Sequence, residues 1–498
     1  MTAKLTRRVF LSGLSALIPV GTAWANAPAT SLRPQPRSAR AVKLASGGVE
    51  SVVARAGLRG EVVCAVAHAE TGLELEALGG GKGLPPASVA KALTALYALE
   101  TLGASYRFET SLVATGGVAN GVVQGDLILL GGGDPTLDTD GLARLAANLK
   151  AAGVREVRGE FKVCDGALPF VASIDPDQPD HVGYSPAVSG IALNFNRVHF
   201  EWKRSGQGYS VAMDARTEKY RPQVDIARMK VMKRSLPVYT YADKQGRDQW
   251  TVASGALGKG GARWLPVRKP AAYAGDVFRT LARSNGIVLK AAKTTRVLPK
   301  GGQVLAVHES VDLQKIVQNM LKYSNNLTAE MVGMSATVAR GKKPANLRAS
   351  GQEMSSWAAT RYGMSGTRLV DHSGLGDASR MTPQDLVGAL VAARKTVDLR
   401  PLLKTFPMRD SKGRVDKSHS IRVDAKTGTL NFVSGLGGYM TAGDGTEMAF
   451  AIFTADTKTR SRIKRADRER PEGARAWNRQ SKRLQQALIE RWGRVYGS

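Results

Sequence analysis

The sequence predicts an α+β protein in which a sheet-and-helix domain is interrupted by a long insertion and then resumed. Alternating apolar and polar residues at 60–77 indicate a β-hairpin, and a helical pattern follows it. The middle of the chain, at 195–270, is instead rich in strand and turn patterns. Helical patterns dominate from residue 311, and strand patterns return at 421–455. The two outer parts therefore share one architecture, which the middle part lacks.

The first 25 residues have the features of an export signal. A basic head precedes a short apolar run, and Ala23-Trp24-Ala25 fits the A-x-A cleavage pattern. The apolar run is too short to span a bilayer, and no later stretch is long enough. Arg7 and Arg8 also resemble the twin-arginine signature, which makes the Tat pathway a candidate route. We expect a periplasmic protein without a transmembrane anchor, whose residues 26–45, rich in Pro, Arg and Ser, form a flexible leader.

Changes in pattern divide the rest of the chain into candidate domains. The outer parts, 46–110 and 303–456, form one domain, and 111–302 is inserted between them. Residues 195–270 are a candidate third domain nested in the insertion, and 457–498 are a basic tail. Helical patterns lie at 88–102, 139–152, 276–286, 311–323, 325–340, 345–363, 383–395 and, at the end of the tail, 474–496.

The charge of the chain restricts its partners. Lys and Arg total 71 against 42 Asp and Glu, a net charge of +29, which favours polyanions or an anionic surface. Aromatic residues are only 6% of the chain and no nucleic-acid motif is present, so we expect no nucleic-acid partner. An anionic cell envelope fits the export signal better. The basic stretch 458–470 is either a solvated face or an electrostatic attachment to that envelope.

Cysteine and histidine are too rare to predict a metal or cofactor site. Of the six histidines, none is clustered with a cysteine, so we expect neither a metal nor another cofactor. Cys64 and Cys164 both lie in apolar strand patterns. An oxidising compartment permits a disulfide between them, and two buried thiols are the alternative.

A serine and a lysine share one face of the first helical pattern. In L-P-P-A-S-V-A-K-A-L-T-A-L (84–96), Lys91 follows Ser88 by three residues, which makes the two side chains neighbours on a helix. A lysine without water around it has a lowered pKa and can act as a base, so the pair could be a nucleophile beside its base. The structural alternative is an N-cap serine followed by a lysine that extends to solvent.

Two further motifs follow along the chain. Ser324-Asn325-Asn326 places a hydroxyl and an amide between two helical patterns, and Lys426-Thr427-Gly428 lies in a strand pattern. Glycine in a strand permits close approach by another backbone or a ligand. Each segment alone is weak, because Ser324 could cap a helix and Lys426 could lie on a solvated edge strand.

In this order, S-x-x-K, S-x-N and K-T-G resemble the motifs of penicillin-recognising serine enzymes. The long separation of Ser88 and Ser324 is unlike class A β-lactamases and small carboxypeptidases. The chain resembles the D-alanyl-D-alanine carboxypeptidase/endopeptidase family of the penicillin-binding protein 4 type, peptidase family S13. G-G-G-D-P-T-L at 131–137, V-D-H-S-G-L-G at 370–376 and G-G-Y-M at 437–440 also resemble that family. The middle motif has Asn in place of Asp, and the 370–376 segment departs from the family pattern at two positions.

The resemblance implies a fold and a site. A five-stranded antiparallel sheet flanked by helices carries the site, and the insertion forms one or two mostly β domains. Ser88 is the nucleophile, Lys91 its base, and Ser324 a relay to the leaving group. The resemblance also implies substrate-binding residues, namely Asn326, Lys426, Thr427, Gly428, Thr429 and Asp134. Asp134 would bind the amino group of a diaminopimelate side chain, and a structural role in a turn is the equal alternative for it.

The resemblance also implies an activity. We expect a periplasmic serine DD-peptidase that hydrolyses D-Ala-D-Ala ends, D-Ala-diaminopimelate cross-links or both, through an acyl-enzyme on Ser88. Peptidoglycan peptides are then its substrates and β-lactams its covalent inhibitors. A serine β-lactamase is one alternative, although no separate deacylation glutamate motif is present. A non-catalytic envelope-binding or penicillin-sensing protein is another, although a binder has no need of the base Lys91.

Overall fold

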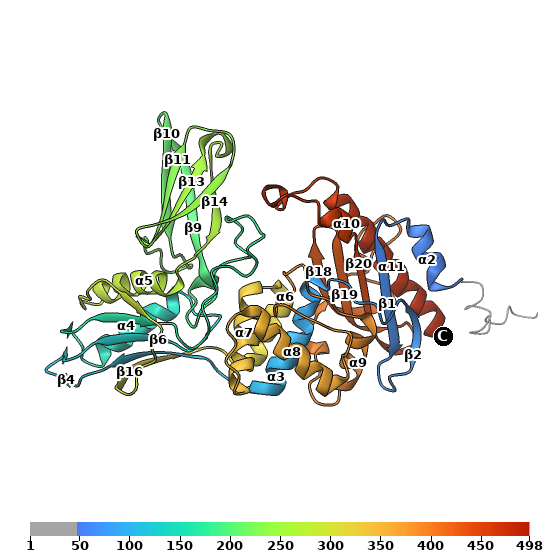
Figure 1. Cartoon of the computed structure of the whole chain (residues 1–498), viewed down its shortest axis with the longest axis horizontal. Helices are drawn as coiled ribbons and strands as arrows, with labels where there is room; N and C mark the ends of the chain where they lie inside the picture. The colour runs from blue at the N-terminus through green and yellow to red at the C-terminus, as the bar shows by residue number, and fades with distance from the viewer. Residues whose placement is uncertain (1–46, 498) are drawn as a thin grey trace, which may run out of the picture.

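The structure, a computed structural model, describes residues 47–497. The predicted export signal and the whole of the predicted leader lie outside these residues. Two lobes are visible in Figure 1. A sheet-and-helix body contains both ends of the described chain, and an elongated insertion extends from it. Within residues 47–497, no helix combines the length and the apolar character needed to cross a membrane.

One antiparallel sheet organises the body. Its strand order is β17-β18-β19-β20-β1-β2, so strands from the two outer parts of the sequence lie side by side. The pairing of β1 with β20 joins these parts at the centre of the sheet. The strands are β1 (Glu61–His68), β2 (Glu74–Leu78), β17 (Lys404–Thr405), β18 (Arg422–Leu430), β19 (Val433–Thr441) and β20 (Glu447–Ala455). The five long strands match the sheet implied by the resemblance, and the two-residue β17 extends one edge.

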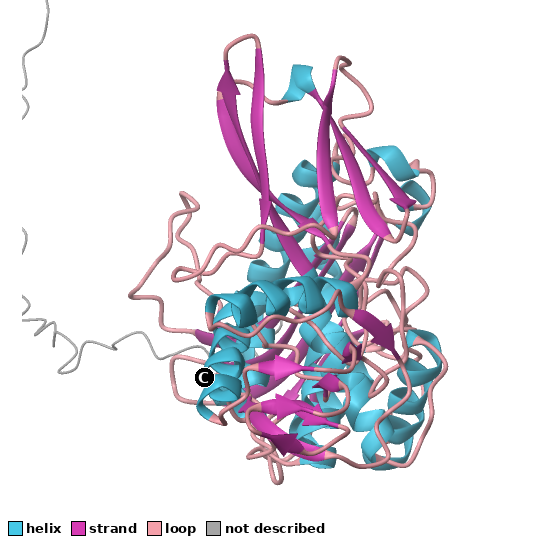
Figure 2. Cartoon of the chain, turned by 90° about the vertical axis from the view of Figure 1, so that its left-hand side faces the viewer, coloured by secondary structure: helices cyan, strands magenta, loops and turns pink. Residues whose placement is uncertain are grey.

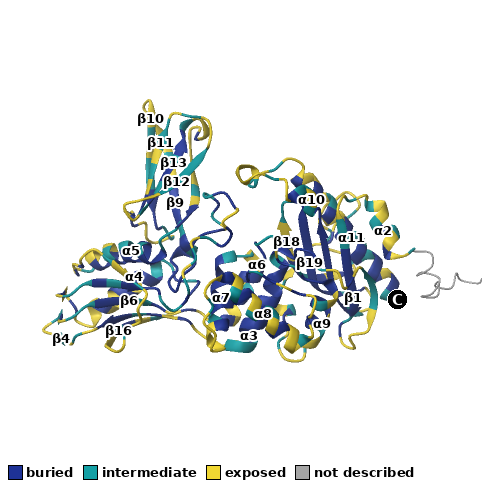
Figure 3. Cartoon of the chain, viewed as in Figure 1, coloured by how far each residue is buried: buried dark blue, intermediate teal, exposed yellow. Residues whose placement is uncertain are grey.

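Helices cover both faces of this sheet, as Figure 3 shows by the buried strands between them. One face carries η1 (Ala87–Val89), α3 (Ala90–Leu102), α6 (Leu313–Tyr323), α7 (Asn326–Ala339), α8 (Leu347–Tyr362) and α9 (Pro383–Ala393). The other face carries α2 (Val49–Ala56) and α11 (Ala474–Tyr496). Trp492 of α11 is fully buried against the sheet, so the end of the predicted tail packs on the body.

The insertion contains several smaller sheets and two long helices. Its largest sheet has the order β15-β8-β6-β3-β16, and α4 (Thr139–Ala151) and α5 (Pro270–Ser284) pack on it. Two three-stranded sheets, β10-β9-β14 and β11-β13-β12, stand at its far end (Figure 2). The strands are β3 (Glu109–Ala114), β4 (Val118–Ala119), β5 (Val122–Val123), β6 (Leu127–Gly131), β7 (Glu156–Val157), β8 (Phe161–Cys164), β9 (Arg197–Ser205), β10 (Gly208–Asp214), β11 (Ala227–Met232), β12 (Tyr239–Lys244), β13 (Arg247–Ala253), β14 (Gly260–Pro266), β15 (Lys293–Thr295) and β16 (Gln303–Glu309).

The chain enters and leaves the insertion through one antiparallel pair. β3 pairs with β16 from Glu109 opposite Glu309 to Ala114 opposite Gln303. The inserted sheet therefore extends slightly beyond the range 111–302 expected from the sequence, because β16 completes its edge. Cys64 and Cys164 are both buried free thiols, which corresponds to the second of the two alternatives for this pair.

Candidate active site

Ser88 lies in a tight turn that joins a proline-rich segment to α3. The turn η1 precedes α3, and Ala87 has a φ of 48°, in the region that most residues avoid. The turn packs directly against β18. A Cβ atom on Gly428 would lie 2.7 Å from the carbonyl oxygen of Pro86 and 3.1 Å from the backbone nitrogen of Ser88. Glycine at this position therefore permits the K-T-G strand to approach the serine turn.

Lys91 is fully buried and makes three contacts through its side-chain nitrogen. Its Nζ lies 3.0 Å from Ser88 Oγ, 2.7 Å from Asn326 Oδ1 and 2.8 Å from the carbonyl oxygen of Ser373. Three acceptors match the three N–H bonds of an ammonium group. In the neutral amine, Asn326 and Ser373 can accept the two remaining N–H bonds while the lone pair faces the Ser88 hydroxyl. The site is compatible with both protonation states of Lys91.

Burial lowers the pKa of Lys91 to about 8, whereas the nearby carboxyl groups of Glu330 and Asp371 oppose that change. Burial removes water from the charged form and so favours the neutral amine. A pKa near 8 leaves a useful fraction of neutral amine near neutral pH, which is a requirement for a general base. Negative charge on the neighbouring carboxyl groups favours the protonated amine and so limits the fall in the pKa of Lys91.

Sequence reasoning assigned neither carboxyl group a role in the site, although Asp371 lies in the segment 370–376 that resembles the family. Glu330 of α7 accepts hydrogen bonds from the backbone N–H groups of His372 and Ser373, at 3.0 and 2.9 Å. Asp371 accepts from Gly374 and Gly376, at 2.8 and 2.6 Å. Both groups are buried, and burial raises the pKa of each, to about 8 for Glu330. Together they fix the turn that presents the Ser373 carbonyl to Lys91.

The middle motif lies at the junction of α6 and α7. Ser324 ends α6 in the left-handed conformation, with a φ of 57°. The alternative N-cap role for this serine is wrong, because Asn325 is the N-cap of α7 and accepts from the backbone of Thr328 at 3.1 Å. Asn326, the first residue of α7, thereby faces Lys91. The sharp junction brings the hydroxyl of Ser324 and the amide of Asn326 to the same site.

Lys426 connects the third motif to the second. Its Nζ lies 3.0 Å from Ser324 Oγ and 2.6 Å from the carbonyl oxygen of Thr427. Burial, followed by the charge of Lys91, holds the pKa of Lys426 well below its usual value. The alternative of a solvated edge lysine is wrong, since only 2% of this residue is exposed. The serine–lysine pair of the first motif therefore has a second serine–lysine pair beside it.

The edge of β18 is open along the K-T-G motif. β17 pairs only with Asp424 and Ala425, so no strand among the described residues pairs with this edge from Lys426 to Leu430. Thr427 and Thr429 are exposed, whereas Gly428 is buried against the serine turn. An unpaired strand edge can form main-chain hydrogen bonds with an extended peptide.

A cavity of about 550 Å³ adjoins the second motif, between the insertion and the α6–α7 junction. The insertion contacts the motif directly, because Asn326 Nδ2 donates to the carbonyl oxygen of Tyr184 at 3.0 Å. The cavity is lined by residues of both lobes, including Tyr184, Phe195, Arg197, Tyr323, Ser324 and Asn326.

Asp134 is the one predicted site residue that the structure does not bring to this group. Its Oδ1 accepts from the backbone and the hydroxyl of Thr136, both at 2.7 Å, which is the geometry of a turn residue. Its other oxygen is buried without a hydrogen bond, 3.8 Å from His308 Nε2. The contacts of Asp134 favour its alternative role in the turn. Between residues 47 and 497, no group of three or more His, Cys, Asp or Glu could hold a metal.

The fold and the three motifs together define a serine peptidase with the fold of a penicillin-binding protein. The chain belongs to the D-Ala-D-Ala carboxypeptidase 3 (S13) family, whose family model matches residues 45–470. A D-alanyl-D-alanine carboxypeptidase of Actinomadura sp. (strain R39) is 29% identical over 78% of this chain and 76% of its own length. D-alanyl-D-alanine carboxypeptidase DacB of Haemophilus influenzae is 26% identical over 76% of this chain and 83% of its own length.

A solved structure shares the fold. Penicillin-binding protein 4 (dacB) from Haemophilus influenzae superposes with a TM-score of 0.68 and 22% identity, over 82% of this chain and 93% of that one. A structure of the same protein complexed with a β-lactam gives a TM-score of 0.66, also at 22% identity, over 82% of this chain and 92% of that one. The predicted family, fold class and enzyme class are confirmed.

Proposed function

We propose that this protein hydrolyses the D-Ala-D-Ala ends of peptidoglycan peptides, D-Ala-diaminopimelate cross-links, or both, through an acyl-enzyme on Ser88. The observation that carries the proposal is the 3.0 Å contact between Lys91 Nζ and Ser88 Oγ at a buried site. A lysine that only stabilised the fold would gain little from burial beside a hydroxyl. Membership of a D-Ala-D-Ala carboxypeptidase family supports the substrate class.

Acylation begins with neutral Lys91 as the general base. Its lone pair takes the proton of Ser88 while the serine oxygen attacks the carbonyl carbon between the two D-alanines. Asn326 Oδ1 and the Ser373 carbonyl hold the amine in this orientation. The backbone N–H groups of Ser88 and Thr429 are the proposed oxyanion hole, which by analogy contributes several kcal/mol.

The second serine–lysine pair serves the leaving group and the substrate carboxylate. In this proposal Ser324, hydrogen-bonded to Lys426, relays to the departing D-alanine nitrogen the proton that Lys91 took from Ser88, so the C–N bond breaks and Lys91 is neutral again. Lys426 and the exposed hydroxyls of Thr427 and Thr429 bind the terminal carboxylate. The depressed pKa of Lys426 reflects burial without a counter-ion, so an arriving carboxylate favours its charged form. Asp134 remains the least supported contact, through a diaminopimelate amino group.

Water then hydrolyses the acyl-enzyme. A β-lactam presents a carboxylate and a reactive carbonyl to the same groups, and its acyl-enzyme is expected to be long-lived. The β-lactam complex of the Haemophilus influenzae protein supports this part of the proposal.

The proposed place of action is the periplasm, after export through the signal in residues 1–25. We place the catalytic domain at 46–110 and 303–456, with 111–302 as the inserted domains. Electrostatic attachment to an anionic envelope is supported by a groove of about 680 Å³ between α2 and α11. Its lining includes Arg55, Arg479, Arg483 and Arg494, on the side of the sheet opposite the serine turn.

The test is acylation by a fluorescent penicillin, followed by intact mass spectrometry of the mature protein and a Ser88→Ala variant. A stable adduct on the parent alone, with D-alanine released from a pentapeptide, supports the proposal. Hydrolysed penicillin without an adduct would indicate a β-lactamase. Intact penicillin without an adduct would indicate a binding protein. Cross-linked peptide dimers then separate endopeptidase from carboxypeptidase activity.

A further inference from the structure

Two segments outside the three motifs meet beside the site. One is residues 175–184 of the insertion, here called the tip loop. The other is residues 457–472 between β20 and α11, here called the strap, which includes α10 (Thr457–Arg460) and reaches from the body toward the insertion (Figure 1). We propose that the strap holds the tip loop so that the Tyr184 carbonyl orients the Asn326 amide toward Lys91. The inference rests on the proposed acylation of Ser88 and assigns positioning residues to it.

The amide of Asn326 must present its oxygen to Lys91. An amide has an acceptor on one side and donors on the other. Oδ1 accepts from Lys91 Nζ at 2.7 Å, and Nδ2 donates to the Tyr184 carbonyl at 3.0 Å. A rotated amide would direct N–H bonds at the lysine and lose both contacts. The carbonyl of Tyr184 therefore selects the orientation that Lys91 requires.

The tip loop is attached to the strap through Arg465 and Glu469. Arg465 of the strap lies 2.8 Å from Asp180 and donates to the carbonyl oxygen of Pro176 at 3.1 Å. Glu469 lies 2.7 Å from His181 of the tip loop and 2.9 Å from Arg263 of β14. The tip loop is thus held by an ion pair at Asp180 and by a hydrogen bond at His181.

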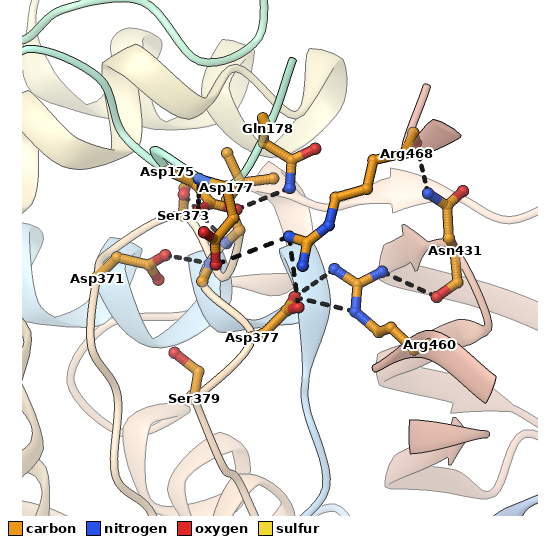
Figure 4. A network of polar contacts seen from close by, with 12 residues as sticks. Asp175, Asp177, Gln178, Asp371, Ser373, Asp377, Ser379, Asn431, Arg460 and Arg468 are labelled. Atoms are coloured by element: carbon orange, nitrogen blue, oxygen red, sulfur yellow. Dashed lines mark hydrogen bonds and ion pairs between the residues drawn. The ribbon is translucent and has the colours of Figure 1, made fainter. Parts of the chain in front are cut away.

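The strap is attached to the body through Arg460 and Asn431. Arg460 is only 8% exposed, and it donates to Asp377 at 2.9 Å and to the carbonyl oxygen of Asn431 at 2.9 Å. The side chain of Asn431 donates to the carbonyl oxygen of Arg468 at 2.6 Å. Figure 4 shows Arg460 and Arg468 between Asp377, Asn431 and the tip loop. The strap is therefore a fixed bridge and not a fully solvated tail.

Contacts within the insertion support the shape of the tip loop independently of the strap. Arg268, within the insertion, donates to the carbonyl oxygens of Ser185, Asp180 and Ala172, at 2.7, 2.8 and 3.1 Å. The base of the loop also packs on α7 through an apolar cluster that includes Leu168 and Ile174. Loss of the strap contacts should leave the loop folded and free its tip to move relative to Asn326.

Loss of the strap contacts should change acylation of Ser88 in two ways. A mobile Asn326 amide orients Lys91 less well, so the acylation rate constant with fully neutral lysine falls. The 2.7 Å hydrogen bond from charged Lys91 to Asn326 Oδ1 is also weakened, which lowers the pKa of Lys91. The acid limb of the pH profile then moves to lower pH. A protein that was only less stable would form less adduct, but the acid limb of its pH profile would stay at the same pH.

The experiment compares fluorescent-penicillin acylation by the full mature chain across pH. The test variant is Arg465→Ala with Glu469→Gln. The matched control is Arg462→Ala with Glu472→Gln, which makes the same charge changes at exposed strap positions without side-chain contacts to the tip loop. In the test variant, we expect the acylation rate constant at its alkaline plateau to be about three- to ten-fold lower than in the parent. We also expect the acid limb of the profile to lie at lower pH. Arg465→Lys with Glu469→Asp should recover most of the rate.

Each other outcome overturns the inference. A test variant that behaves like the control would show that the strap does not position Asn326. Faster acylation would show that the tip loop obstructs the site instead. A lower plateau with an unmoved limb would indicate a structural role only. A parent that forms no adduct would refute the proposed function itself, whereas the other three outcomes leave that function intact.

Discussion

Gly428 offers a direct test of the packing between the K-T-G strand and the serine turn. An alanine there would place its Cβ 2.7 Å from the Pro86 carbonyl oxygen, whereas ordinary contacts begin near 3.4 Å. The strand or the turn must therefore move by about 0.7 Å, which is close to the ~1 Å misplacement that costs about 100-fold in rate. We expect Gly428→Ala to lower the acylation rate constant about 30- to 100-fold. The overpacking itself should cost about 1–3 kcal/mol of stability.

The assay is stopped-flow acylation by a fluorescent penicillin, with the free energy of unfolding measured in urea. Gly388→Ala in α9 is the matched control, because no atom lies within 4 Å of its added Cβ and helices favour alanine. Acylation by Gly428→Ala at the parental rate, with parental stability, would refute the argument that this contact sets the geometry of Ser88.

Three further outcomes follow from burial. Lys91 must be neutral to act as the base, and its pKa is about 8. The acylation rate constant should therefore rise about tenfold per pH unit below pH 8 and level off above it. A rate constant that does not change with pH would contradict the role of Lys91 as the base. Burial raises the pKa of the Cys64 thiol to about 12 and also raises the pKa of the Cys164 thiol. The native protein should therefore react slowly with a thiol reagent, whereas both thiols of the unfolded protein should react readily. A melting temperature that falls when a reductant is added would contradict free cysteines. Because the ring of Trp492 is fully buried, Trp492→Ala should lower the free energy of unfolding in urea by about 3–5 kcal/mol. A loss below about 1 kcal/mol would mean that the packing of α11 does not stabilise the body.

The sequence predicted most of the candidate site because its chemistry is carried by residue types. The structure brings Ser88, Lys91, Ser324, Asn326 and Lys426 together from three distant segments. The fold class followed from the same motifs together with the return of strand patterns near the end of the chain. Their roles in catalysis stay predictions until acylation is measured.

Other parts of the site could not be predicted, for physical reasons. The contact of Tyr184 with Asn326 uses a backbone carbonyl, which every residue has, so no residue type marks it. Glu330 could have been found, because it lies four residues after Asn326 on the same helix face, yet a lone glutamate in an apolar helix has many explanations. Asp134 matched a family segment, but its contacts are those of a turn.

The basic tail illustrates a limit of charge counting. A run of Arg and Lys suggests a solvated face, but Arg460 is buried and pairs with Asp377, which lies far from it in sequence. The partner carboxylates are scattered through the insertion and the body. Only the three-dimensional structure shows that they meet the tail.

The pairing of β1 with β20 has a consequence for biosynthesis. β1, which precedes the serine turn, is hydrogen-bonded to β20, which the ribosome synthesises several hundred residues later. Such non-local pairing makes folding slow and leaves strand edges exposed in the meantime. A partly synthesised chain carries the nucleophile but lacks the support for it, so the hydrolase should remain inert until translation has passed β20. Such late assembly delays the onset of activity until the whole catalytic sheet is present.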